Sequence, residues 1–80
     1  MKNLNNEEIK MTLGERLSLL RYVNKISQRV MAVHCGVNER TYKNWEHELT
    51  TPTNARLLVI AEKFHVEPAW LILGTGNIIL

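Results

Sequence analysis

The stretch SQRVMAVHCGVNERTYKNWE, residues 27–46, decides the fold of this chain. Its pattern predicts two short helices joined by a tight turn. Ala32 is small enough to let a second helix cross at close range, and Gly36 can take the positive φ that ends a helix without steric cost. Asn38 then supplies an N-cap for the second helix, which is expected over residues 38–47. We therefore expect a helix-turn-helix.

Three further helices are predicted by their capping residues. Thr12 and Glu15 fit a capping box, so a first helix is expected from residue 12 to about residue 23. Thr53 is a good N-cap for a fourth helix, and Pro68 favours the start of a short fifth one. The predicted fold class is therefore all-α, a compact five-helix domain.

Apolar residues at spacings of three and four predict the helix faces that form the core. The expected core residues are Leu13, Leu17, Leu20, Met31, Cys35, Val37, Tyr42, Trp45, Leu57, Leu58, Ile60, Ala61 and Phe64. Arg16 and Arg21 lie off the buried stripe of the first helix. Val30 and Val33 fall on the outer side of the second helix, and the sequence leaves open whether they are covered.

The composition divides the chain into three parts. Residues 1–11 are polar and are expected to form a flexible arm, residues 12–76 the folded domain and residues 77–80 an apolar tail. Hydrophobic residues make up 45% of the 80 residues, which favours one globular domain over disorder.

Several classes of protein are disfavoured by what the sequence lacks. Cys35 is the only cysteine, so neither a disulfide framework nor a Cys-pair zinc site is expected. His34 and Cys35 are adjacent and point about 100° apart on a helix, so we expect no metal. Without a nucleophile beside a base, a carboxylate pair or a Gly-rich phosphate loop, we expect no enzyme, cofactor or small-molecule ligand. Without a signal peptide or an apolar run of about 20 residues, we expect a cytoplasmic protein that does not enter membranes.

Positive charge concentrates in the first half of the chain. Six Lys and Arg oppose three Glu in residues 11–47, whereas two oppose three in residues 48–80. A basic face for nucleic acid and an ordinary solvated surface are both compatible with this distribution.

In the order and spacing of its motifs, the chain resembles the Cro/CI family of bacterial and phage regulators, which are lambda-repressor-like and also called the XRE family. The matching motifs are LGERL (13–17), ISQ (26–28), Ala32 with Gly36-Val37, Trp45-Glu46, Pro52 and VEPAWLILG (66–74). The resemblance covers about residues 12–76. It implies an all-α domain that binds operator DNA as a dimer, with a structural ion pair between Arg21 and Glu46. Glu39, Glu48 and the non-basic Leu49-Thr50-Thr51 depart from the family pattern.

One face of the second helix of the motif is expected to read base edges in a major groove. The expected base contacts are Asn38, Glu39, Arg40, Lys43 and Asn44. Arg40 suits guanine, Asn44 suits adenine and Glu39 suits cytosine. The alternative is a solvated helix face on which Glu39 and Lys43 pair with each other.

Phosphate contacts are expected at the start of the first helix of the motif and in the loop after the second. The expected residues are Ser27, Gln28, Arg29, Thr50 and Thr51. For Gln28 the contact is implied by the resemblance, and the alternative is a residue that only favours the helix start.

A homodimer is expected because one helix reads too few base pairs for useful specificity. Its interface is assigned to Trp70, Ile78, Ile79 and Leu80. Trp70 fits the core equally well, and the tail could instead fold back on the first helix.

These features predict a sequence-specific DNA-binding transcriptional regulator, a phage or prophage-type repressor that binds double-stranded DNA at a palindromic operator. An antitoxin that binds a toxin as well as DNA is one alternative. The other is a protein-interaction module without DNA binding, which Glu39 and the non-basic loop would favour.

Overall fold

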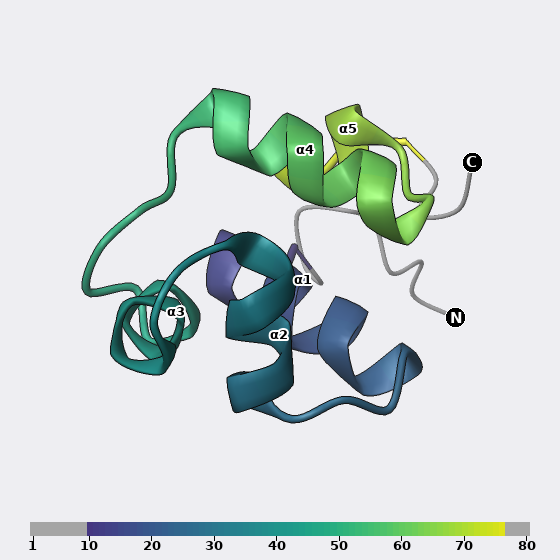
Figure 1. The fold of residues 1–80 in the computed structure, drawn as a ribbon. Helices are drawn as coiled ribbons and strands as arrows, with labels where there is room; N and C mark the ends of the chain where they lie inside the picture. Colours follow the sequence, from purple (N-terminus) through teal and green to yellow (C-terminus); the bar gives the residue numbers. More distant parts are fainter. Residues whose placement is uncertain (1–9, 77–80) are drawn as a thin grey trace, which may run out of the picture.

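The computed structural model describes residues 10–76, which form five α-helices (Figure 1). The helices are α1 (Leu13–Val23), α2 (Gln28–Cys35), α3 (Glu39–Glu46), α4 (Asn54–Phe64) and α5 (Pro68–Leu73). The predicted all-α, five-helix fold is therefore confirmed. Most of the predicted arm and all of the predicted tail, including Ile78, Ile79 and Leu80, lie outside the described residues.

The first four helices begin at the predicted caps. The side-chain oxygens of Thr12, Ser27, Asn38 and Thr53 each accept the backbone N–H three residues later. Such a bond satisfies one of the N–H groups that have no partner inside the helix. At Thr12 the capping box is complete, because Glu15 also accepts the Thr12 N–H at 2.9 Å.

The core lies where the five helices meet. Its buried residues are Leu17, Leu20, Met31, Ala32, Cys35, Tyr42, Trp45, Leu57, Ile60, Ala61, Val66, Trp70 and Leu71. The prediction of Leu58 as a core residue was wrong, because its side chain is 49% exposed. Each residue advances a helix by about 100°, so a neighbour of buried Leu57 turns toward solvent.

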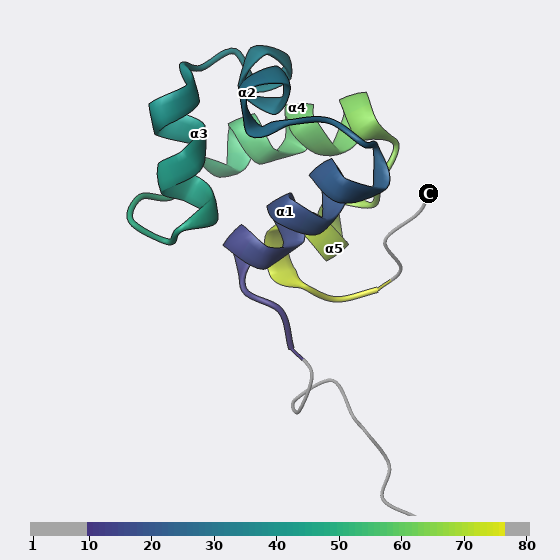
Figure 2. The same cartoon turned by 90° about the horizontal axis from the view of Figure 1, so that it is seen from below.

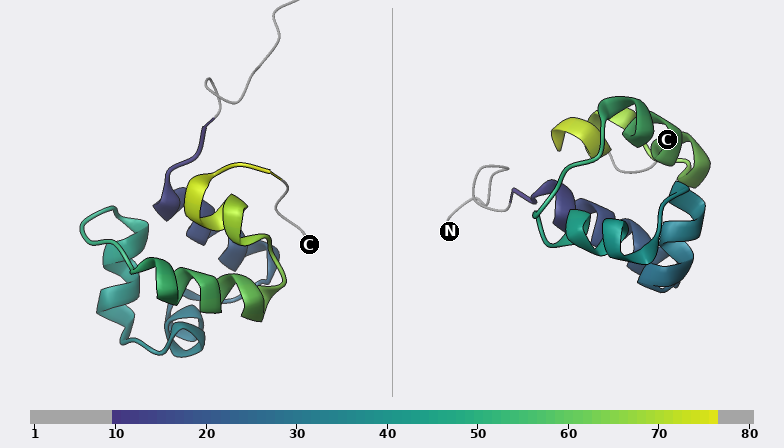
Figure 3. Two further views of the ribbon diagram at one scale, coloured as in Figure 1. Left: turned by 90° about the horizontal axis from the view of Figure 1, so that it is seen from above. Right: turned by 60° about the vertical axis from the view of Figure 1, so that its left-hand side comes forward.

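The helices pack so that α3 has one free side (Figures 1 and 2). α1 packs against α3 and α5, α2 against α3 and α4, and α4 against α5. α3 therefore touches the body of the molecule through α1 and α2 and stands at its edge. Residues 47–53 run along one flank from α3 up to α4, as both views in Figure 3 show.

Arg16 is buried, although it lies off the apolar stripe of α1 and was counted among the cations of the basic half. Its side chain is 6% exposed, and its Nε donates to the Leu71 carbonyl at 2.9 Å. The guanidinium also donates to the carbonyls of Met11 and Ile72. Carbonyls at the end of a helix have no partner inside it, so this cation satisfies the end of α5. Burial lowers the pKa of Arg16, and the charge of Glu48 partly opposes this.

Gly14 allows the close approach of α1 and α3. A Cβ at this position would lie 2.9 Å from the carbonyl carbon of Glu46 and closer still to the Glu46 oxygen and the Glu48 carboxylate. The backbone N–H of Gly14 donates to Glu48 Oε2 at 2.7 Å. The glycine is thus required by the space between two helices.

We predict that Gly14→Ala destabilises the protein, although alanine is the better helix former by about 1 kcal/mol. The added methyl group must push α3 away from α1, and overpacking of this kind costs about 1–3 kcal/mol. Thermal unfolding followed by circular dichroism measures the effect as a lower Tm.

Val23→Ala is the matched control, because it raises helix propensity in the same helix at an exposed position. We expect its Tm to equal or exceed that of the original chain. A Gly14→Ala protein with an unchanged or higher Tm would show that α1 and α3 do not approach as described.

Candidate nucleic-acid interface

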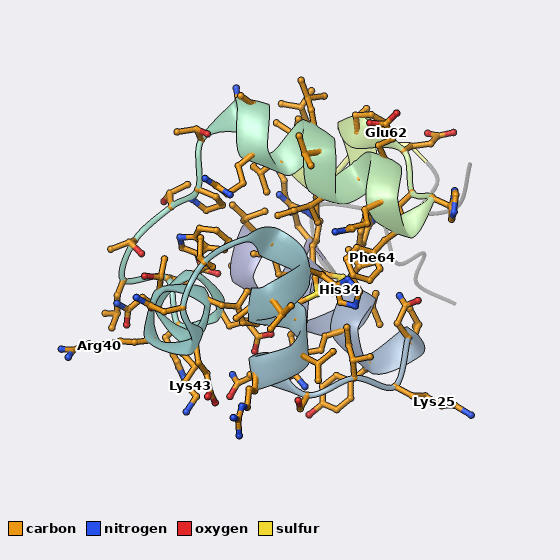
Figure 4. All side chains as sticks on the ribbon, in the orientation of Figure 1. Lys25, His34, Arg40, Lys43, Glu62 and Phe64 are labelled. Carbon is orange, nitrogen blue, oxygen red and sulfur yellow. The ribbon has the colours of Figure 1, made fainter. Side chains whose placement is uncertain are left out.

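The outward side of α3 carries two exposed cations. Arg40 and Lys43 both project away from the body of the molecule (Figure 4). Tyr42 and Trp45 point the other way and are buried. The helical repeat separates these two sets because residues three or four apart share a face. The described part of the chain leaves Arg40 uncovered.

Glu39 partly neutralises this face. Its Oε2 lies 3.2 Å from Lys43 Nζ, one helical turn away, and both side chains are about half exposed. Arg40 has no ion-pair partner among the described residues. The pairing of Glu39 with Lys43, which was given as the alternative to base contact, is therefore present in the free protein, and Arg40 carries the unopposed charge.

The two asparagines of the motif differ in how their side chains are used in the structure. The Asn38 side-chain oxygen accepts the Thr41 N–H at 2.7 Å, so its amide N–H groups are the part left for a ligand. The Asn44 side chain is partly buried, and its backbone carbonyl accepts the Leu49 N–H at 2.9 Å.

The start of α2 lies next to α3, because these two helices pack together. Ser27 Oγ accepts the Val30 N–H at 3.1 Å, while Arg29 is exposed. The first N–H groups of a helix carry a partial positive charge and attract anions. The residues predicted for base contact and those predicted at the start of α2 therefore occupy neighbouring elements.

The turn between α2 and α3 is secured from α4. Gly36 takes a φ of 74°, which lets α2 end in the left-handed conformation. Arg56 Nη1 donates to the Cys35 carbonyl at 2.6 Å, and Lys63 Nζ donates to the His34 carbonyl at 3.3 Å. Sequence reasoning missed these two cations, because only the tertiary fold places α4 beside the end of α2.

The loop after α3 carries no Lys or Arg in residues 47–53. Thr50 and Thr51 are exposed. Glu48 has a φ of 63° and its carboxylate turns back to the N–H of Gly14 at the start of α1. The departure of Glu48 from the family pattern thus has a structural role, since it ties the end of α3 to α1.

The Glu46 carboxylate joins three helices. Arg21 of α1 donates from Nε to Oε2 at 2.8 Å, so the expected ion pair is present. Gln28 of α2 donates from Nε2 to Oε1 at 3.0 Å, and Tyr42 of α3 donates its hydroxyl to Oε2. Arg21 also donates to the Ile26 carbonyl at 3.3 Å. Only the Arg21 partner was foreseen, because the sequence does not reveal which polar groups share one carboxylate.

Hydrogen bonding keeps Glu46 ionised. Burial acts to raise the pKa of Glu46, but the hydrogen bonds from Arg21, Tyr42 and Gln28 outweigh burial and lower it. The pKa of Arg21 is raised, mainly by its hydrogen bond to Glu46. Burial and the bond to Glu46 together raise the pKa of Tyr42. Glu46, Arg21 and Tyr42 are therefore present as a carboxylate, a guanidinium and a neutral phenol.

Residues 14–77 match the model of a protein family described as the helix-turn-helix domain. This chain belongs to that family. Among solved structures, it is similar to the P22 c2 repressor protein in complex with a synthetic operator, with a TM-score of 0.73 and 27% sequence identity. The likeness covers 82% of this chain and all of that one. The resemblance to Cro/CI-type regulators is thus confirmed. A search of curated proteins finds no match.

Trp70, which was assigned to the dimer interface, lies inside this helix-turn-helix domain. Its side chain is 8% exposed and belongs to the core. Of the two predicted roles for Trp70, the core is therefore correct, and an exposed dimer contact is wrong. The reason is that α5 turns Trp70 and Leu71 inward against the rest of the core.

Two further properties concern residues 10–76 only. No group of three or more His, Cys, Asp or Glu able to hold a metal occurs among them, and burial raises the pKa of the Cys35 thiol to about 11. In the same range, every helix is too short or too polar to cross a membrane.

We predict that Glu46→Gln lowers the free energy of unfolding by about 3 kcal/mol at neutral pH, because a half-buried Arg21 loses its counter-charge. The folded-state pKa of Glu46 lies below its ordinary value of 4.5. The stability it provides is therefore complete above that pH and is lost as the pH falls toward the folded-state pKa. Urea unfolding between neutral pH and about pH 3 measures both effects.

Glu39→Gln is the matched control, since it removes an exposed ion pair worth only about 0.3–0.5 kcal/mol. The double variant Arg21→Met/Glu46→Gln is expected to lose less than the sum of its two single variants. Strictly additive losses would contradict a shared, half-buried pair.

Proposed function

We propose that this helix-turn-helix protein is a sequence-specific DNA-binding repressor of transcription. The observation that supports this proposal best is the outward side of α3, from which Arg40 and Lys43 project away from the body of the molecule (Figure 4). The solved chain of the P22 c2 repressor protein, all of which is covered by the likeness, is described as in complex with a synthetic operator. A major groove admits one α-helix, and an uncovered helix with cationic and amide side chains suits it.

In this function the two sets of predicted residues act differently. Arg40 would donate two hydrogen bonds to a guanine, and Asn44 and Asn38 would meet neighbouring bases. The start of α2, with Gln28 and Arg29, would hold a phosphate. Contacts to phosphates position the protein, and contacts to bases select the sequence.

Glu39 would limit where the protein binds. Its carboxylate can accept from cytosine N4, but it must first leave Lys43, and near phosphates it is repelled. Once Lys43 is released, it becomes available for a base or a phosphate. Because Glu39 would exchange Lys43 for a cytosine, we expect the protein to favour sites that have a cytosine at the base pair facing Glu39.

We further propose a phage or prophage-type repressor that acts in the cytoplasm as a homodimer on a two-fold symmetric operator. Two linked copies double the number of base pairs that are read. With Trp70 buried, the proposed interface is reduced to the tail residues Ile78, Ile79 and Leu80. Repeated selection of bound fragments from random duplex DNA would reveal a two-fold symmetric site if this is correct.

We predict that Arg40→Ala costs about 1–3 kcal/mol of binding to the selected duplex and relaxes the preference at one base pair. Lys43→Ala should weaken binding to all sequences by similar amounts. Affinities from fluorescence anisotropy, measured on the selected duplex and its single-base variants, test both effects.

Glu62→Gln is the control, because Glu62 is an exposed charged residue in the last turn of α4, at the end farther from α3 (Figure 4). It should leave affinity nearly unchanged. If Arg40→Ala and Lys43→Ala also have no effect on a duplex that binds, the outward side of α3 is not the reading surface.

The dependence on salt separates a DNA-binding protein from a protein-interaction module. For a protein that neutralises several phosphates, the logarithm of affinity falls linearly with the logarithm of salt concentration. We expect this steep decline with the selected duplex. Failure to select any duplex at low salt would instead favour the protein-interaction module.

A further inference from the structure

The Gln28 side chain is held by a group that can only accept hydrogen bonds. Its Nε2 lies 3.0 Å from Oε1 of Glu46, which also receives Arg21 Nη2 at 3.3 Å. A carboxylate has no proton to donate, so the nitrogen side of the amide must face Glu46. The amide of Gln28 therefore has one favoured orientation.

A primary amide nitrogen carries two N–H groups about 120° apart. Only one of them can point at Glu46, so the second is left to point elsewhere. Gln28 is the first residue of α2, and its side chain is only partly buried. Among the described residues, no hydrogen bond occupies the second N–H.

From this geometry we infer that Glu46 is a positioning residue for DNA binding, which rests on the function proposed above. By accepting one N–H of Gln28, it directs the second N–H toward the DNA phosphate at the start of α2. Glu46 itself does not touch DNA. It acts through Gln28.

The physical reason lies in the orientation of the amide. Without Glu46, the amide could turn over and present its oxygen to a phosphate, which repels it. An unheld side chain would also lose rotamer freedom on binding, which lowers the affinity. Glu46 removes both losses before DNA arrives, because the amide is already turned in the free protein.

The same bond links the reading helix to the phosphate contact. Glu46 is the last residue of α3, which carries Arg40, and Gln28 is the first of α2. The hydrogen bond between them joins these two ends directly. A shift of α3 would therefore move the Gln28 amide as well. The base-contacting residues of α3 and the phosphate-contacting amide thus keep a fixed position relative to each other.

Nuclear magnetic resonance of the wild-type chain tests the orientation directly. The two N–H protons of the Gln28 amide give separate signals. We expect Glu46→Gln to shift the signal of one proton in the free protein. Addition of the selected duplex to the wild-type chain should shift the signal of the other. If saturation with duplex leaves that second proton unchanged, the inference is overturned.

A double-mutant cycle on duplex affinity tests the coupling. Gln28→Met removes both N–H groups and keeps the length of the side chain. We expect Glu46→Gln to weaken binding about tenfold more in the wild-type background than in the Gln28→Met background. Equal losses of affinity in both backgrounds would overturn the inference, since Glu46 would then support only the fold.

Two readouts separate positioning from general destabilisation. Tyr42→Phe removes a different donor of the same carboxylate, so it should lower Tm without any coupling to Gln28→Met. Gln28→Met should leave the salt dependence of binding unchanged, because glutamine is neutral and releases no counterion. Coupling of Tyr42→Phe with Gln28→Met would overturn the inference.

The inference and the proposed function fail differently. If the wild-type chain binds no selected duplex, the proposed function is wrong and the inference is overturned with it. If the duplex binds tightly and depends on Arg40, but the cycle is additive, only the inference is overturned.

Discussion

The Glu46 carboxylate is the interaction on which the rest of the motif depends. A charge in a partly buried place is costly unless donors surround it, and here α1, α2 and α3 each contribute a side chain that donates to it. The angle of α3 against α1 and α2 follows from satisfying those donors. The inner side of α3 packs against α1 and α2 through these contacts, so its outer side is left exposed.

Geometry rather than bulk charge distinguishes the proposed reading surface. Arg16 is buried, Arg21 is paired with Glu46, and Lys43 is paired with Glu39 in the free protein. Three of the six cations in the first half of the chain are thus already engaged, two of them inside the molecule and Lys43 on its surface. Arg40 and the start of α2 remain, so binding would depend on their exact placement more than on long-range attraction.

Helix boundaries were predicted well because the groups that set them lie within a few residues of one another. Thr12, Ser27, Asn38 and Thr53 accept N–H groups three positions away, and Gly36 ends α2 by its own φ. The core was predicted nearly as well, since helical spacing decides which side is apolar. The prediction that Leu58 is buried was wrong because the apolar residues of α4 cover a wider face than the other helices bury.

The sequence by itself determined five helices, their caps, the tight turn and the outward position of Arg40, because each follows from local bonds or from the helical repeat. Only the tertiary structure decided which groups the side chains of Arg16 and Gln28 contact. Arg16 meets a carbonyl 55 residues away in the chain, and Gln28 meets a carboxylate 18 residues away. Such contacts depend on how whole helices cross, which no short stretch of sequence specifies.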